Sequence, residues 1–155
     1  MSVMKRLNWL LIVVVCVSLV LNIVLGIALN RQNIQSDFVQ KRLDQSFRGC
    51  FSKLAGQLCT KCPEDETGRA LWVKEVEYLA LRCWEYFPLT SYSESQELQG
   101  VILLLHSMAF DWERYPSGLI SHELAVDLLE VAYRLTDDEV LLTEVYEGLK
   151  RASQP

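Results

Sequence analysis

The amino-acid sequence predicts an all-α protein: one N-terminal transmembrane helix followed by a small helical bundle of four to five helices. Three observations support this fold class. Residues 7–30 contain no charged side chain, and the later segments repeat apolar residues at every third or fourth position. No segment shows the strict alternation of apolar and polar residues that is typical of a half-buried strand. The sequence after residue 30 is long enough for one compact domain.

Residues 7–30 are predicted to form an uncleaved signal-anchor helix. At about 1.5 Å rise per residue, a helix over this range reaches about 36 Å, enough for a hydrocarbon core of roughly 30 Å. The alternative is a cleaved signal peptide, with Gly26 and Ala28 as small residues at the cleavage site. The apolar run is longer than the roughly 7–15 residues usual for the core of a signal peptide, which favours the anchor.

The charges that flank this span predict its orientation. Lys5 and Arg6 directly precede the apolar run, which favours a cytoplasmic N-terminus and an extracytoplasmic C-terminal domain. Residues 31–50 contain more bases than the N-terminal tail, but only Arg31 is close to the membrane. The opposite orientation therefore stays open as an alternative, and it would make the chain a tethered regulator in the cytosol.

A stripe of small and polar residues follows one face of the span. Ser18, Asn22 and Gly26 recur at every fourth position. This spacing lets two membrane helices approach closely and form hydrogen bonds within the lipid. We therefore expect self-association into a homo-oligomer, with a polar residue tolerated near one leaflet as the alternative explanation.

Charge is distributed unevenly along the chain. Residues 31–62 carry six bases and two acids, whereas residues 63–155 carry seven bases and 18 acids. A basic juxtamembrane segment can contact anionic head groups, and an acidic remainder argues against nucleic-acid binding. The predicted organisation is a short tail and transmembrane signal-anchor helix over 1–30, a basic juxtamembrane helix over 31–58 that belongs to the bundle, and an acidic helical domain over 59–155.

Apolar residues at helical spacing predict five helical segments after the span. The first is able to continue the anchor without a break, since no Gly or Pro falls between residues 30 and 48. Ser93 with Gln96, and Thr136 with Glu139, fit the capping box that begins a helix. The predicted segments are 31–58, 67–87, 94–114, 121–135 and 137–151.

Cys59 and Cys62, in the segment C-T-K-C, are the best candidates for chemistry. One C-x-x-C supplies two zinc ligands, whereas a structural zinc site uses four, so no metal is expected. A thioredoxin-like centre requires a βαβ context, which is absent, and the acids at 64–66 disfavour a thiolate. The pair is predicted to be a local disulfide outside the cytosol or two idle thiols inside it. A membrane-anchored thiol/disulfide protein is the alternative function.

Cys50 and Cys83 fall in phase with the apolar faces of their helices, so they are interpreted as small buried hydrophobic residues. In an antiparallel hairpin they would lie about 12 Å and 24 Å from the connecting turn. They are therefore not expected to be level with each other, as a disulfide with Cα atoms within about 7 Å requires.

Three tyrosines at helix ends and in loops, Tyr86, Tyr92 and Tyr115, are candidates to line a groove for a protein partner. No nucleophile elbow, P-loop or dinucleotide fingerprint is present, so no catalytic residue and no cofactor is expected. The predicted function is a single-pass, membrane-anchored helical interaction or scaffold protein of the cell envelope, without enzymatic activity.

Overall fold

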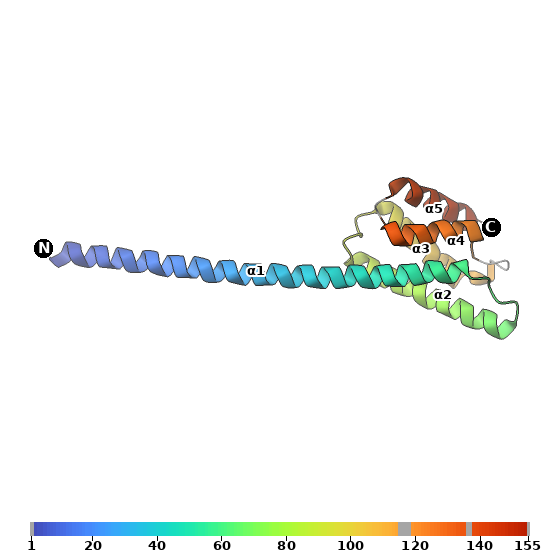
Figure 1. The fold of residues 1–155 in the computed structure, drawn as a ribbon, viewed down its shortest axis with the longest axis horizontal. Helices are drawn as coiled ribbons and strands as arrows, with labels where there is room; N and C mark the ends of the chain where they lie inside the picture. The colour runs from blue at the N-terminus through green and yellow to red at the C-terminus, as the bar shows by residue number, and fades with distance from the viewer. Residues whose placement is uncertain (1, 115–118, 136–137, 155) are drawn as a thin grey trace. The chain divides into compact units, whose positions relative to one another are not determined.

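The computed structural model describes residues 2–114, 119–135 and 138–154 of the 155-residue chain, and their side chains except those of residues 2–16 and 20. The described structure is 85% helical and contains no strand, which confirms the all-α fold (Figure 1). Its five α-helices and two short 3₁₀ turns are α1 (Ser2–Cys59), α2 (Glu66–Tyr86), η1 (Phe87–Leu89), α3 (Gln96–Phe110), η2 (Trp112–Arg114), α4 (His122–Arg134) and α5 (Glu139–Ala152).

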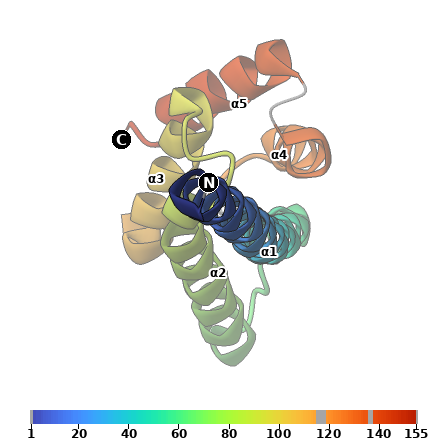
Figure 2. The same cartoon turned by 90° about the vertical axis from the view of Figure 1, so that its left-hand side faces the viewer.

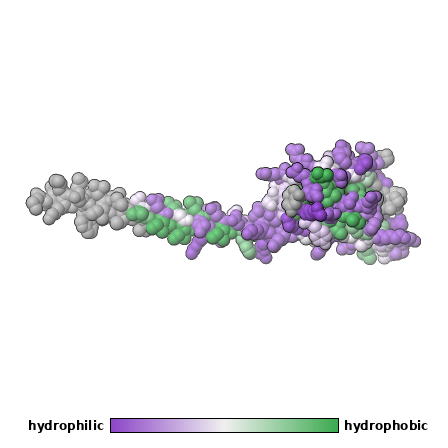
Figure 3. Space-filling model, turned by 45° about the horizontal axis from the view of Figure 1, so that its top comes forward, coloured by the Kyte–Doolittle hydropathy of each residue, from purple (hydrophilic) through white to green (hydrophobic). Residues whose placement is uncertain are grey.

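The chain divides into two compact units, Met1–Val39 and Gln40–Pro155. The first unit belongs to α1, and every side chain described in it is exposed. Figure 3 shows apolar side chains, in green, gathered along its described part. Within the described residues, α1 is the one helix long and apolar enough to cross a membrane, by length and composition. A signal sequence near the N-terminus has the same two properties.

The second unit is the helical bundle. In it, α2 packs against α3, α3 packs against α5, and α4 packs against α5. Figure 2 shows α5 lying across α3 and α4. The segment of α1 from Gln40 onward also belongs to this unit, and it supplies a continuous apolar face to the core. The buried residues of that face are Phe47, Phe51, Leu54, Ala55 and Leu58.

The buried face of α1 is shorter than its apolar periodicity suggests. The same period includes Val39 and Leu43, but Val39 is 55% exposed and Leu43 is half-buried. Burial becomes complete only at Phe47, whose ring packs on Phe51 and Phe87 with centroids 5.7 Å and 5.8 Å away. The spacing of apolar residues gives the phase of a helix face, whereas the neighbouring elements decide how far along the helix that face is covered.

The helix starts follow local capping chemistry, with one correction. Asp65 caps α2 by accepting a hydrogen bond from the backbone N–H of Gly68 at 2.6 Å, so the acids before this helix include its N-cap. The predicted capping box of Ser93 and Gln96 is wrong. Ser93 is held in a turn by its backbone bond to the Thr90 carbonyl. Ser95 caps α3 instead.

The start of α5 lies partly outside the described residues. The predicted box paired Thr136 with Glu139, and Thr136 is not among the residues described. Asp138 is the N-cap of α5, and its carboxylate accepts from the backbone N–H of Leu141 at 3.1 Å. The same carboxylate also pairs with Arg134 at the end of α4, at 3.1 Å, so Asp138 joins two consecutive helices.

A set of polar contacts fixes the loop after α2 against α1, and we call it the Asp44 junction. The Asp44 carboxylate accepts from the backbone N–H of Ser91 at 2.9 Å and from its hydroxyl at 2.8 Å. Gln40 donates to the carbonyl of Leu89 at 3.0 Å and to Asp44 at 3.2 Å. Because Gln40 and Asp44 are one helical turn apart, one face of α1 holds the loop at two points.

Candidate functional site

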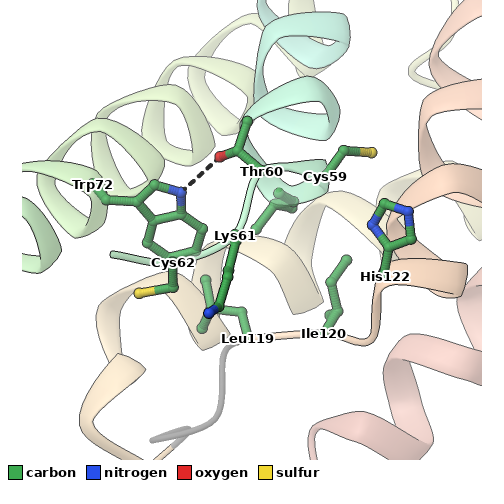
Figure 4. Close-up of a pocket in the computed structure, with 9 residues that line it drawn as sticks. Cys59, Thr60, Lys61, Cys62, Trp72, Leu119, Ile120 and His122 are labelled. Atoms are coloured by element: carbon green, nitrogen blue, oxygen red, sulfur yellow. Dashed lines mark hydrogen bonds between the residues drawn. The ribbon is translucent and has the colours of Figure 1, made fainter. Parts of the chain in front are cut away.

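The C-T-K-C segment lies where α1 ends and the linker to α2 begins. The side chains of Cys59 and Cys62 border a pocket of about 380 Å³ (Figure 4). Thr60 anchors the linker, since its hydroxyl accepts from the indole N–H of Trp72 at 3.0 Å. The pocket is lined by Leu58, Cys59, Thr60, Lys61, Cys62, Trp72, Leu119, Ile120 and His122.

The two thiols of this segment do not face each other. Figure 4 shows the sulfur atoms of Cys59 and Cys62 pointing in different directions from the linker, and both residues are half-buried free cysteines. Burial raises the pKa of the Cys59 thiol, so this thiol stays protonated at neutral pH and is a weak nucleophile. The geometry therefore favours no redox role for the pair, and the disulfide or idle thiols expected here stay a prediction.

The residues around this pocket do not combine into a metal centre. His122 lines the same pocket as the two cysteines (Figure 4). In the described part of the chain, however, no three His, Cys, Asp or Glu side chains converge well enough to hold an ion. Lys61 pairs with Glu64 at 2.6 Å on the exposed surface. We assign no catalytic role to this pocket.

The sequence predicts that Cys50 and Cys83 lie at different positions along the paired helices α1 and α2. This expectation is wrong. The Cys50 thiol donates to the backbone carbonyl of Leu79 at 3.6 Å, in the turn of α2 that carries Cys83, and the neighbouring Cys83 thiol affects the pKa of Cys50. Cys50 lies nine residues before the end of α1 and Cys83 lies 17 residues after the start of α2. Their contact therefore places the start of α2 about 12 Å beyond the end of α1.

The linker between the two helices explains this stagger. Its residues, 60–65, are not helical, and a chain of six residues can extend to roughly 20 Å. Figure 1 shows the first turn of α2 lying beyond the last turn of α1. The expectation assumed a hairpin in which the end of the first helix and the start of the second lie side by side at the turn. The T-K-C-P run that follows Cys59 is not helical, and it was the signal in the sequence that could have warned against it.

The pKa values of the two thiols shift in opposite directions. The hydrogen bond from Cys83 lowers the pKa of Cys50 and outweighs the effect of burial, and the positive charges of Arg82 and Lys53 lower it further. The hydrogen bond with Cys50, together with burial, raises the pKa of Cys83 well above its ordinary value. Cys50 is therefore the member of the pair that more readily becomes a thiolate.

Two of the three candidate tyrosines have partners within the chain. The Tyr86 hydroxyl accepts from Arg82 at 2.5 Å. The Tyr92 hydroxyl accepts from Arg48 at 2.7 Å, and its ring lies 6.0 Å from that of Phe47. Both tyrosines are half-buried, and Tyr115 lies outside the described residues. The partner-binding groove stays a prediction.

The stripe in the apolar span is accessible in the described part of α1. Ser18, Asn22 and Gly26 are all exposed. A Cβ placed on Gly26 would meet nothing within 4 Å, so another helix can approach this point of the backbone closely. Association through the stripe stays a prediction.

Sequence reasoning missed a partly exposed aromatic surface, formed by the half-buried Trp84 of α2 and His106 of α3 together with the exposed Phe110 of α3. The His106 ring lies 5.6 Å from that of Trp84 and 4.8 Å from that of Phe110. Phe110 is 53% exposed, and Leu103, two turns earlier on α3, is 49% exposed. We call these four residues the aromatic surface. The seven-residue spacing of Leu103 and Phe110 was the signal available in the sequence.

Comparison with protein-family models, with curated proteins and with solved structures gives no match for this chain.

Proposed function

We propose that this chain is a single-pass, membrane-anchored interaction or scaffold protein of the cell envelope, without catalytic activity of its own. The observation that carries the proposal is the composition of α1. One end of this helix exposes large apolar side chains such as Leu21, Ile23 and Leu25, each more than half exposed, while Phe47 and Phe51 near the other end are fully buried. Exposed apolar area of this extent is unfavourable in water and is covered when a bilayer surrounds it.

The orientation proposed for the anchor places the bundle outside the cytoplasm. Lys5 and Arg6 precede the span, and basic residues flanking a span are retained on the cytoplasmic side. The bundle then contributes a mostly polar surface, on which the aromatic surface is a concentrated apolar area suited to a protein partner. In the membrane, Ser18, Asn22 and Gly26 form the face on which a second copy would pack.

The anchor is tested on the full chain by extracting membranes with alkaline carbonate and floating them on a density gradient. The protein is expected to stay with the lipid and to keep its full mass. A variant with Leu21→Arg and Leu25→Arg is expected to leave the membrane fraction, because two charges inside a span oppose insertion. A chain that loses its first residues and appears in the soluble fraction would show that the segment is a cleaved signal peptide.

Self-association is tested by chemical cross-linking in membranes. Asn22→Leu combined with Gly26→Leu is expected to reduce the cross-linked dimer. The matched control, Ile23→Leu, changes a residue off the stripe and is expected to leave the dimer unchanged. If only monomer is recovered for the unchanged chain, with no partner cross-linked, the interaction role is refuted.

A further inference from the structure

We propose that Cys50 and Cys83 are the site of an intramolecular disulfide that covalently links α1 to α2. The link would join the helix that carries the apolar span to the first helix packed beside it in the bundle. It depends on the geometry of the bundle and not on the orientation of the span. Its failure would therefore leave the proposed membrane function standing.

The backbone places the two sulfur atoms on facing helices. The Cys50 thiol lies 3.6 Å from the carbonyl oxygen of Leu79. In an α-helix, that carbonyl is the hydrogen-bond acceptor for the residue four positions later, which is Cys83. Cys50 is therefore in contact with the turn of α2 that carries Cys83. Neighbouring contacts between Phe47 and Phe87, 5.8 Å apart, fix the same antiparallel register.

The two cysteines differ in access, and this difference sets the order of the reaction. Cys83 is 0% exposed, whereas Cys50 is half-buried and reaches the surface. A reagent from solution therefore meets Cys50 first. Arg82 and Lys53 provide positive charge near Cys50, which favours the thiolate that attacks a disulfide.

The proposed chemistry is thiol–disulfide exchange with a small-molecule or protein disulfide as the oxidant. The Cys50 thiolate attacks one sulfur of the oxidant, which releases one thiol and leaves a mixed disulfide on Cys50. Cys83 then gives up its proton and attacks the Cys50 sulfur, which expels the second thiol. Two thiols of the chain become one disulfide, while the oxidant's disulfide is reduced to two thiols.

Cys59 and Cys62 provide an internal comparison. They are closer in sequence than Cys50 and Cys83, yet their sulfur atoms point in different directions (Figure 4). A disulfide between them requires the linker to rearrange, whereas the Cys50 thiol already lies against the turn of α2 that carries Cys83. The structure therefore predicts that oxidation selects the pair that is distant in sequence.

The cross-link would also stabilise the bundle. It closes a loop that contains the end of α1, the linker and most of α2, so it restricts the unfolded chain far more than a link between Cys59 and Cys62 would. For a loop of this length, the rise in melting temperature is expected to be roughly 10 °C. Reduction with a phosphine should reverse it.

The test uses the full chain in detergent micelles, first reduced and then equilibrated with increasing oxidised glutathione. After denaturation and alkylation with a maleimide, the number of modified cysteines is expected to fall from five, the total in the chain, by two. Peptide mapping without reduction should recover a linked peptide that contains Cys50 and Cys83. Cys50→Ser should abolish both results, whereas Cys59→Ser should leave both unchanged.

Two outcomes would overturn the proposal. One is a linked peptide that joins Cys59 to Cys62 in place of the expected pair. The other is full alkylation of Cys50 and Cys83 at glutathione concentrations that oxidise any other cysteine of the chain. Near-UV circular dichroism shows that each variant is folded, and Cys50→Ala provides a second substitution at the half-buried position if the serine variant is unstable.

Discussion

Replacing Phe47 by alanine tests whether the second part of α1 is a structural member of the bundle. Phe47 is 0% exposed. Its ring lies 5.7 Å from Phe51, 5.8 Å from Phe87 and 6.0 Å from Tyr92, measured between centroids. Phe47→Ala therefore removes a ring that joins α1 to η1 and to the loop after it, and leaves a cavity at this point of the core.

The expected loss of stability is about 3–5 kcal/mol, the range for Phe→Ala at a fully buried site. Domains of this kind unfold with about 5–15 kcal/mol, so the variant loses a large part of its stability. At about 4 °C per kcal/mol for a unit of this size, the melting temperature should fall by about 12–20 °C. Part of this loss comes from the contacts between aromatic rings, which are worth about 0.5–1.5 kcal/mol per pair. This part is already included in the total and is not added to it.

The assay is thermal unfolding of the full chain in detergent, followed by near-UV circular dichroism. The signal reports the packing of Trp72, Trp84 and Trp112 in the second unit. Phe110→Ala is the matched control, because it removes the same side chain from a position that is 53% exposed. Its expected cost is about 1 kcal/mol, from the lost contact with a neighbouring ring. Equal melting temperatures for the two variants would refute the inclusion of α1 in the core.

Four further predictions use the same unfolding assay. Asp44→Ala should cost about 1–2 kcal/mol at pH 7, because it leaves the donors of the Asp44 junction unpaired. Burial raises the pKa of Asp44, but its hydrogen bonds and a nearby arginine lower it more. This stabilisation is present above the unfolded pKa and is lost as pH falls through the folded pKa, so the two melting curves should converge in acid. Gly100→Ala should destabilise by about 1–3 kcal/mol, because its Cβ would lie 2.5 Å from the Tyr146 ring. Gly49→Ala, with nothing within 4 Å of the added Cβ, should instead stabilise by about 0.5–1 kcal/mol. Asp65→Ala should cost about 1 kcal/mol by removing the N-cap of α2, and an unchanged melting temperature would contradict that role.

The helices and their buried faces could be predicted from the sequence because both depend on local pattern. Apolar spacing identified Leu98, Val101 and Ile102 as one face of α3, and all three are buried. The end of α2 followed from Pro88, since the residue before a proline is disfavoured in the helical conformation. These features need no information about what lies opposite each helix.

Capping was predictable only in part, because several serines and acids compete at each helix start. Ser93 and Ser95 both suit the role by residue type. The choice between them depended on the turn that Thr90 and Tyr92 form with the following backbone. Sequence patterns could not predict the partner of Tyr92 either, because Arg48 belongs to α1 and is far from Tyr92 in the sequence.

The sequence by itself determined that this chain is helical, that one segment is apolar and without charge, and which side of each bundle helix is buried. These follow from the period of the α-helix and from the cost of exposing apolar area to water. The tertiary structure decided which residues of different helices meet. The Cys50 thiol meets the turn of α2 that carries Cys83 because the extended linker shifts α2 along α1 by about two helical turns, and that shift is set by packing between the helices.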